Sequence, residues 1–599
     1  MPREWAEPRL ARMVKSMCHE SFYESGTSIH ESLGVYVGWT ALKNSFALGM
    51  PVSNETGDIS LVFSGEEYPE PDAIRELRQK GHSIGETQAS YLVHVSEEGL
   101  DFPASLNGMF HGLLTDQTSS KVTLFNDRYG MHRIYYHESK EAFYFAGEAK
   151  AILAVCPELR TPSDQGLGEF AAYGCVLENR TLFKDIHVLP SASSWVFRNA
   201  VVEQKNTYFD PREWEQQSSL DPESYYQELR EVLSRILPSY FKGPELVGVA
   251  ITGGLDTRVI MALHKAVPRS VPCYTFGGMF RECQDVEVGR KVAQASQQTH
   301  QVIKVGEDFL AQFPHYAERS IYLTEGGVDV YRASDLYVSE KARDIAPAKV
   351  VGTYGSEIVR HAVMFKPMTL ADGLLHPEFM IQVKHAGETY RKIRRAHPVT
   401  FAAFRQSPWY HHGVLALEQT QLSVRSPYLD NNFVRCVYRA PSKDIGHADI
   451  RLRLVGNGNS ALGQIRSDRG IGGNSGQLTR ALSRALLEFS FKAEYAYDYG
   501  MPQPVAQIDH FLSALRLERL FLGRHKFLHF RIWYRDQLSS YIREMLLDPI
   551  SLSRSYLQKH SVESIVQGHL QGDHNYTTEI HRLLTMELLH RTFFDARSL

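Results

Sequence analysis

In the first third of the chain, short runs of hydrophobic residues follow one another with polar residues between them. Between about residues 34 and 208, short apolar runs such as SLVF, VTLFND, RIYYH and AFYFAG are bounded by Gly, Asn, Asp and Ser. Runs of this kind between turn-forming residues are typical of strands in a sheet. Two stretches, 74–80 and 86–97, have helical spacing instead. The pattern predicts a β-rich unit that contains two short helices.

From about residue 220 the pattern changes to longer, alternating segments. A helix is predicted at 222–237, followed by a buried strand at 246–251, a Gly-Gly turn and a helix that begins near Asp256. The strand-like runs VPCYTFG and QVIKV enclose a helical DVEVGRKVAQAS, and KVVGTYG supplies a further strand that ends in glycine. This alternation predicts βαβ units and a parallel sheet. From about Pro367 onward, helices are predicted to dominate.

A polar segment separates the two patterns. FDPREWEQQSS, at 209–219, lacks the periodicity of a strand. We therefore predict two domains, 1–208 and 209–599, which is the usual number for a chain of 599 residues. The predicted fold class is α+β followed by α/β, in which a parallel-sheet domain ends in a helical C-terminal part.

The composition and net charge limit the kinds of partner that this chain could bind. The chain is 43% hydrophobic and 22% charged, with a net charge of -4 and a pI near 6.7, which argues against a nucleic-acid or membrane-surface partner. Its six cysteines lack C-x-x-C spacing, and this argues against a zinc site or a disulfide framework. The charged N-terminus does not resemble a signal peptide, and no apolar stretch of about 18 residues occurs. We expect a cytoplasmic protein.

The most informative segment is VGVAITGGLDTRVIMAL, at 247–263. A β-branched strand runs into Thr252, Gly253 and Gly254, and a helix starts at Asp256 and Thr257. Glycines let the backbone approach a ligand closely, and a helix N-terminus offers unpaired N–H groups to an anion. The threonine hydroxyls add donors, and the aspartate could hold Mg²⁺ against phosphates. The segment is not a Walker P-loop, and on its residues alone a capped strand-to-helix turn is an equal alternative.

This segment resembles the S-G-G-x-D-S pyrophosphate loop of the asparagine synthetase superfamily, whose members adenylate a carboxylate and release pyrophosphate. Thr252 and Thr257 replace serines, and Arg258 stands where a small residue is usual. VSNETGDISLVFSGEEYPEPDAIRELRQKGH, SLNGMF and FNDRYGMHRIYY are similar to the glutaminase half of the family, while TFGG, VGTYGSE, SVRSPYLDNNFVRCV and SDRGIGG follow the order of the synthetase half. The resemblance implies a glutaminase-like, Ntn-type β-sandwich, an adenylating synthetase domain, and ATP with Mg²⁺ as cofactors.

The resemblance also implies that the first domain has lost its glutaminase activity. Family glutaminases use the cysteine directly after the initiator Met as nucleophile, and here that position is Pro2. The family's Asn-Gly-Glu is 64–66, SGE, its clamp arginine aligns near Thr40, and its substrate aspartate is Glu86. Cys18 is interpreted as structural. The amine must then come from elsewhere, as in the β-lactam synthetases, carbapenam synthetases and lasso-peptide cyclases, which close a ring within one molecule.

VGTYGSE, at 351–357, resembles the segment that supplies the second metal carboxylate. The resemblance implies Asp256 and Glu357 as metal ligands, and Gly352 as part of the nucleotide site. Tyr354 stands where β-lactam and carbapenam synthetases place a catalytic tyrosine. A phenol takes a proton from an amine only when a neighbouring charged group tunes it, and Glu388, on a predicted helix, is assigned that role. A packed aromatic beside the sheet is the alternative for Tyr354.

The lysine that the family uses to neutralise the adenylate is Asp468 here, in RSDRGIGG. Arg466 and Arg469 flank this position, and we assign the catalytic charge to Arg469.

Three functions remain open. The first is intramolecular amide formation by an AMP-forming ligase, with a macrolactam-forming, lasso-type peptide cyclase as the preferred member; its partners would be a precursor peptide and a leader peptidase. The second is an ammonia- or amine-dependent ligase that acts on a carboxylate-bearing small molecule. The third is a non-catalytic binding paralogue. Pyrophosphate release from ATP separates the first two from the third, and a precursor-peptide gene beside this one separates the first from the second.

Overall fold

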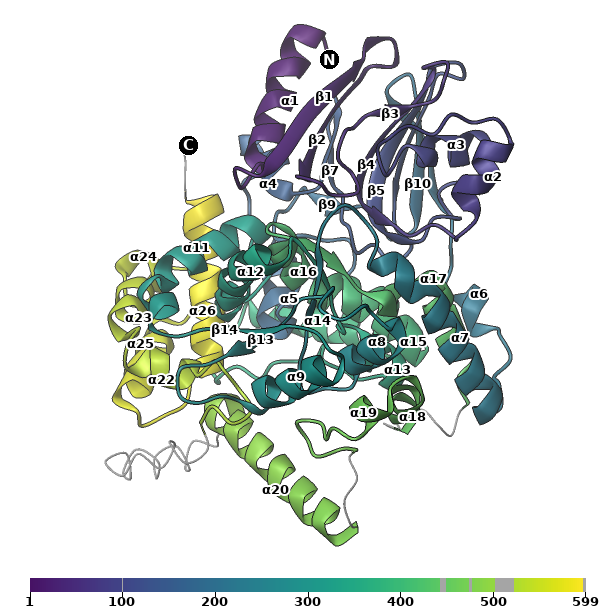
Figure 1. The fold of residues 1–599 in the computed structure, drawn as a ribbon. Coiled ribbons are helices and arrows are strands. Elements are labelled where there is room, and N and C mark those ends of the chain that lie inside the picture. Colours follow the sequence, from purple (N-terminus) through teal and green to yellow (C-terminus); the bar gives the residue numbers. More distant parts are fainter. Residues whose placement is uncertain (100, 442–448, 473–476, 501–521, 596–599) are drawn as a thin grey trace.

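The computed structural model describes residues 1–99, 101–441, 449–472, 477–500 and 522–595 (Figure 1). Its first third contains antiparallel sheets, and the remainder contains a parallel sheet covered by helices, followed by a helical C-terminal part. The predicted fold class is therefore confirmed. None of the helices among these residues is both long and apolar enough to cross a membrane.

Antiparallel strands form three sheets in the first third of the chain. Six strands follow the order β11-β10-β6-β5-β4-β3, β7 lies between β8 and β9, and β1 pairs with β2. The strands are β1 Tyr23–His30, β2 Val35–Leu42, β3 Val52–Ser53, β4 Ile59–Glu67, β5 Gly108–Asp116, β6 Lys121–Asn126, β7 Tyr135–Glu138, β8 Phe143–Ala146, β9 His187–Val188, β10 Ser193–Arg198 and β11 Val201–Thr207. The helices of this part are α1 Arg3–Met17, α2 Ala73–Gln79, α3 Tyr91–Glu97, α4 Ala149–Leu153 and α5 Asp164–Tyr173, with 3-10 turns η1 Glu31–Leu33 and η2 Pro157–Leu159.

The six-stranded sheet is covered on both faces. Its apolar core joins Phe63 of β4 and Phe110 of β5 to Leu92 of α3 and to Phe143 of β8. Figure 1 shows α2 and α3 beside one face of this sheet, while β1, β2 and α1 lie on the opposite side. Burial on both faces explains why the first half of β4, 59–63, is a nearly continuous apolar run that does not alternate.

The second sheet is parallel throughout and has the order β14-β13-β12-β15-β16. Its strands are β12 Val247–Ala250, β13 Cys273–Gly277, β14 His300–Lys304, β15 Ala348–Val350 and β16 Ser423–Arg425. The chain builds outward from β12 to β14 and then returns to add β15 on the other side of β12. The strand order therefore reverses between β12 and β15, which is where parallel α/β sheets bind ligands, beyond the carboxyl ends of the strands.

Helices pack around the parallel sheet and are the main elements of the other described residues after 209 (Figure 1). They are α6 Arg212–Glu215, α7 Pro222–Tyr240, α8 Asp256–His264, α9 Gln284–Ala295, α10 Glu307–Ala311, α11 Phe313–Thr324, α12 Ala333–Ile345, α13 Gly355–Arg360, α14 Met380–Ile393, α15 Pro398–Phe401, α16 His412–Gln419, α17 Asn431–Val437, α18 Asp449–Gly458, α19 Ser460–Gly463, α20 Gln477–Tyr495, α22 Phe530–Arg535, α23 Ser539–Leu546, α24 Pro549–Leu552, α25 Lys559–Gln571 and α26 Thr577–Leu589. The 3-10 turns of this part are η3 Val330–Arg332 and η5 Pro427–Leu429, and the π-helices are η4 Ala402–His411, η6 Ala496–Gly500 and η9 His590–Phe594.

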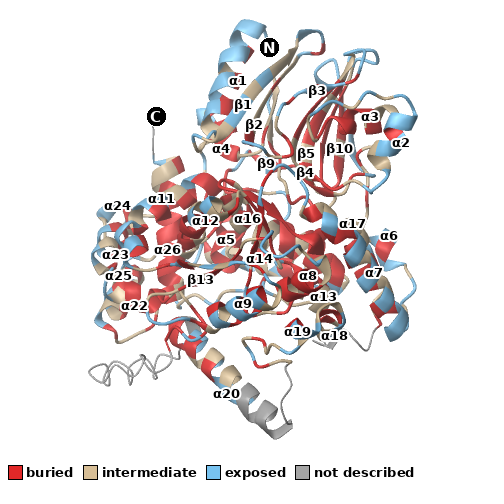
Figure 2. Ribbon diagram, in the orientation of Figure 1, coloured by how far each residue is buried: buried red, intermediate tan, exposed pale blue. Residues whose placement is uncertain are grey.

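One apolar core continues from the first part of the chain into the second. It includes Phe170 of α5, Val249 of β12 and Leu584 of α26. Arg582 of α26 is 1% exposed and donates hydrogen bonds to the carbonyl of Phe170 and, at 3.1 Å, to Asp329. Figure 2 shows this burial as a continuous band through the parallel sheet and α26. The two parts therefore pack as one body, and the boundary at 208/209 stays a prediction.

Most predicted elements agree with the structure, and the differences have local causes. The helix predicted at 86–97 begins only at Tyr91, because the Ser90 hydroxyl donates to the carbonyls of Gly85 and Thr87 and holds the preceding residues in a turn. The pattern did not predict α1 or the three-residue strand β16.

Candidate functional site

The Gly-Gly turn lies where the parallel sheet reverses its strand order. β12 ends at Ala250, and α8 begins at Asp256. Thr252 is exposed and Thr257 is buried. Within the described part of the chain, no protein group accepts a hydrogen bond from the N–H of Leu255, Asp256 or Thr257. The start of α8 thus offers unpaired donors to an anion.

The loop after β15 packs directly against this turn. A Cβ atom at Gly352 would lie 2.6 Å from the backbone nitrogen and from Oγ1 of Thr257, and one at Gly355 would lie 2.8 Å from Cγ of Asp256. Neither position has room for a side chain, so the two glycines allow two strand ends to share one site. Tyr354 lies between them with φ of 75°, a conformation that costs a non-glycine residue on the order of 1 kcal/mol or more.

The two predicted metal ligands come from these two loops. Asp256 accepts a hydrogen bond of 2.6 Å from the Ser356 hydroxyl and one of 2.5 Å from Arg451. Burial, together with the charge of Asp256, raises the pKa of Glu357 to about 7. His411 Nε2 lies 3.5 Å from Glu357, but burial lowers the pKa of His411 to about 3, so its ring is neutral. Glu357 is therefore a partly buried acid whose charge its neighbours compensate only weakly.

Arg258 is buried and donates to the carbonyl of Gly253 at 3.2 Å. Arg360, Arg451 and Arg469 also lie near the turn, and only Arg469 was predicted to have a role there. Burial and repulsion by Arg451 lower the pKa of Arg360, and Arg469 adds to this repulsion. Among the described residues Arg360 makes no hydrogen bond or ion pair, and its Nε is buried without a partner. Asp256 offsets part of this repulsion, and a partnerless guanidinium near unpaired backbone donors suits an anion.

Two further carboxylates flank the turn. Asp285 accepts the N–H of Gly253 at 2.7 Å, and the N–H of Asp468 donates to the carbonyl of Gly253 at 3.2 Å. Burial and the charge of Asp468 raise the pKa of Asp285 to about 6. Arg469 lowers the pKa of both acids and lies over the Phe491 ring at 4.2 Å. Arg469 is therefore beside the turn, although its proposed part in catalysis stays a prediction.

Tyr354 is buried, and its ring meets that of His411 edge-on at 5.6 Å. Burial and the nearby charge of Glu418 raise the pKa of Tyr354 well above its usual value, so the phenol is neutral near pH 7. Glu388 is exposed on α14, and no hydrogen bond or ion pair among the described residues links it to Tyr354. The structure thus brings Tyr354 to the carboxylates at the site but does not bring Glu388 to Tyr354.

The positions that the resemblance assigns to glutamine binding line a separate cavity. This cavity of about 310 Å³ lies between the antiparallel sheets, with Thr40 and Glu66 among its lining residues. Arg425 of β16 donates two hydrogen bonds to Glu66, at 2.7 and 2.8 Å, and the Tyr68 hydroxyl donates a third at 2.6 Å. Glu66 therefore forms an ion pair with a residue of the parallel sheet.

Helix α1 lines the same cavity, with Met13 and Val14 among the residues that face it. Cys18 and Glu86 are exposed and are not among the lining residues. Within the described residues, apolar side chains of α1 thus form part of the wall of this cavity.

Sequence reasoning missed three charged residues of the site. Arg360 follows Glu357 on the same short helix, and this nearness was an available signal. Asp285 lies in the helical motif DVEVGRKVA, which served only to establish the order of motifs. Arg451 comes from α18, 195 residues beyond Asp256, and no local pattern points to it.

Comparisons with known proteins agree with the resemblance in part. Residues 6–209 match the family described as a glutamine amidotransferase domain. The asparagine synthetase [glutamine-hydrolyzing] 1 of Bacillus subtilis (strain 168) is 22% identical over 252 residues, which are 41% of this chain and 39% of that protein. The amidase chyE of Penicillium rubens is 24% identical over 253 residues, which are 39% of this chain and 36% of that protein. The chain spans well under half the length of these curated relatives.

Among solved structures, one described as the allosteric regulatory enzyme of purine biosynthesis covers 50% of this chain and 77% of its own. The two share 8% identity with a TM-score of 0.24, which supports no inference. The first part of the chain is thus similar to glutamine amidotransferase domains, and the chain is similar to asparagine synthetases.

Proposed function

We propose that this chain is an ATP-dependent ligase, which activates a carboxylate as an acyl-adenylate, releases pyrophosphate and then forms an amide bond. The observation that carries the proposal is the Arg360 guanidinium, whose Nε is buried without a partner in the described part of the chain, together with the unpaired N–H groups at the Gly-Gly turn. Arg360 has no partner among the described residues and is repelled by Arg451 and Arg469. The phosphates of ATP would supply acceptors for these unpaired donors, and the similarity to asparagine synthetases supports this reaction class.

The geometry of the turn indicates which groups remain for the phosphates. The N–H of Gly253 is bonded to Asp285, and its carbonyl is bonded to Asp468. The phosphates are left with the hydroxyl of Thr252 and the N–H groups between Leu255 and Thr257. Gly254 lets this segment lie close to the ligand without a side chain.

Asp256 and Glu357 would hold Mg²⁺ beside the phosphates. Carboxylate oxygens suit this ion, and the raised pKa of Glu357 is the sign of a negative charge that a cation would compensate. Bound Mg²⁺ would neutralise part of the phosphate charge. Arg451 already pairs with Asp256 and would supply part of the same compensation.

For amide formation the attacking amine must lose a proton, and Tyr354 is the proposed acceptor. Because its phenol is neutral near pH 7, it can accept this proton only by passing its own to a neighbouring carboxylate. Among the acids, Glu418 and Glu357 raise the pKa of Tyr354 most. We propose that they, and not Glu388, take the proton from the tyrosine.

We further propose that the first domain does not hydrolyse glutamine and that the amine belongs to the activated molecule. Pro2 replaces the family nucleophile, and Glu66 is held by Arg425. An intramolecular reaction on a precursor peptide, which yields a macrolactam, fits a site without its own supply of ammonia. An external amine as the second substrate is the alternative.

ATP binding tests the core of the proposal. Isothermal titration with ATP and MgCl₂ should show binding to the intact chain, and Arg360→Gln should weaken it at least about tenfold, the scale of one charge-assisted hydrogen bond. Arg391→Gln removes an exposed arginine on α14 and serves as the matched control, with affinity unchanged. Equal affinity in the wild type and Arg360→Gln, or no binding at all, would contradict the assignment.

Exchange of pyrophosphate into ATP tests the adenylation step. It should require a carboxylate substrate, and peptides encoded beside the gene are the first to try. Asp256→Asn, which keeps the shape of the side chain but loses its charge, should abolish the exchange in a folded protein. Exchange that persists in this variant would exclude Asp256 from the metal site.

A further inference from the structure

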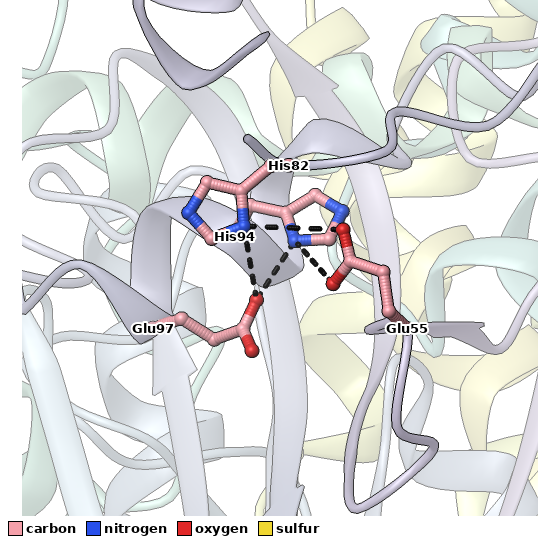
Figure 3. Close-up of side chains that lie close together, drawn as sticks. All are labelled: Glu55, His82, His94 and Glu97. Atoms are coloured by element: carbon pink, nitrogen blue, oxygen red, sulfur yellow. Dashed lines mark hydrogen bonds and ion pairs between the residues drawn. The ribbon is translucent and has the colours of Figure 1, made fainter. Parts of the chain in front are cut away.

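We propose that the first part of the chain contains a zinc-type metal site, separate from the Gly-Gly turn. Its ligands are Glu55, His82, His94 and Glu97, which come together beside the antiparallel sheet (Figure 3). One ligand atom from each residue lies within 4.8 Å of all the others. Neither the proposed ligase reaction nor the resemblance to asparagine synthetases assigns these residues a role.

Three separate segments supply the four side chains. Glu55 lies in the turn between β3 and β4, and His82 lies just after α2. His94 and Glu97 are three residues apart on α3, a spacing that places both on one face of the helix. Figure 3 shows the two imidazole rings side by side with a carboxylate on either side of them. A bound ion would therefore connect two loops to α3.

The distances suit a small ion with tetrahedral coordination. Glu97 Oε2 lies 2.7 Å from Nδ1 of His94 and 3.8 Å from Nδ1 of His82. Carboxylate oxygens of Glu55 lie 3.7 Å from the first ring and 4.0 Å from the second. Ligands bound at about 2.1 Å to a tetrahedral zinc ion lie roughly 3.4 Å apart. The side chains would have to move by up to about 1 Å or slightly more to bring the four ligand atoms to that geometry.

Neighbouring groups orient the ligands toward the centre. The Nε2 atom of His82 is 2.8 Å from Glu98, so its Nδ1 is left for the ion. Asn54 donates to Oε1 of Glu97 at 2.7 Å, and this leaves Oε2 facing both rings. A histidine whose other nitrogen meets a carboxylate, and a carboxylate held by an amide, are the arrangements that surround metal ions in proteins.

The donor set selects the class of ion. Two imidazole nitrogens with two carboxylate oxygens favour Zn²⁺ or a similar transition metal, whereas Mg²⁺ and Ca²⁺ favour oxygen ligands alone. Two carboxylates also balance the charge of a divalent ion. His94 is 1% exposed, so one side of the site is closed to solvent, while the exposed Glu55 leaves an entry path.

Metal content of the full chain tests the proposal. After removal of metal with a chelator, addition of Zn²⁺ and gel filtration, the wild type should retain one Zn²⁺ more per chain than the double variant Glu55→Gln/His82→Ala. These two positions are chosen because neither is fully buried, so the variant should fold without metal. Zn²⁺ should raise the melting temperature of the wild type and leave that of the variant unchanged. His187→Ala, which removes an exposed histidine of the same sheets, should behave as the wild type.

Co²⁺ provides a second readout that does not depend on stability. The wild type should give the intense visible absorption of tetrahedral Co²⁺, and the double variant should lose it. Equal zinc content and equal spectra in the wild type and the variant would overturn the site. ATP affinity should be the same in both proteins, so this result is independent of the proposed ligase activity.

Discussion

At the scale of single residues, Asp285 gives the Gly-Gly turn a negative charge that depends on pH. Its pKa is raised to about 6, so it is neutral below this pH and negative above it. ATP affinity should therefore fall as pH rises through about 6. Asp285→Asn keeps an oxygen for the N–H of Gly253 but cannot ionise, and at pH 7.5 it should bind ATP about tenfold more tightly than the wild type.

Titration calorimetry at pH 5.0 and 7.5 checks this expectation, because pH changes in ATP itself affect both proteins equally. Identical pH profiles in the wild type and Asp285→Asn would exclude an effect of this carboxylate. The raised pKa of Asp285 also affects stability, because an acid whose pKa is raised in the folded state destabilises the fold as it ionises. The free energy of unfolding should thus fall between about pH 4 and pH 6, and less so in the variant.

Tyr354 offers a test of the second half-reaction. Tyr354→Phe keeps the buried ring and its contact with His411 but removes the hydroxyl. ATP–pyrophosphate exchange should persist, while amide formation should fall on the order of 10²-fold, the usual scale for loss of a general base. Full product formation would make the tyrosine structural, and loss of exchange as well would place it in nucleotide binding.

At the scale of elements, the site depends on how closely the β15 loop approaches α8. A methyl group at Gly352 would meet Thr257 at 2.6 Å and push the two loops apart. Gly352→Ala should therefore weaken ATP binding about tenfold or more while the fold is retained. Gly456→Ala on α18 is the matched control, because no atom lies within 4 Å of the added methyl group. Its ATP affinity should equal that of the wild type, and an equal affinity for Gly352→Ala would show that the loops tolerate separation.

Sequence patterns predicted those elements whose residues carry a local signal. β12 and α8 follow from an apolar run, two glycines and a helix start, and all of these lie within one short segment. Strand β16 has only three residues, and two of them are the polar Ser423 and Arg425, so it lacks the apolar run that marks the equally short β15. The Arg451–Asp256 pair depends on the packing of α18 against α8, across 195 residues of sequence. Long-range packing of this kind leaves no trace in local periodicity, so the motif located the turn but not the arginines around it.

At the scale of the whole molecule, Arg425 and Glu66 join the parallel sheet to the antiparallel part. The pair is bidentate and mostly buried, with side-chain exposures of 4% and 13%. Arg425→Met leaves a buried carboxylate without its partner, and this should cost about 3–5 kcal/mol of the free energy of unfolding. Arg425→Met/Glu66→Gln should recover most of this loss, because no charge remains to be compensated. Urea unfolding of the three proteins measures both effects, and a double variant no more stable than Arg425→Met would show that the guanidinium acts through its other contacts.

The contact between α5 and α26 has a consequence for synthesis of the chain. Phe170 receives its hydrogen bond from Arg582, 412 residues later, and both belong to the same apolar core. On the ribosome α5 emerges long before α26 has been translated, so the part of α5 that meets Arg582 stays uncovered until the end of elongation. Such nascent chains are prone to aggregate and are typical clients of chaperones. Ribosome-bound chains halted before α26 should be cut by protease near α5, whereas released full-length chains should resist cleavage there.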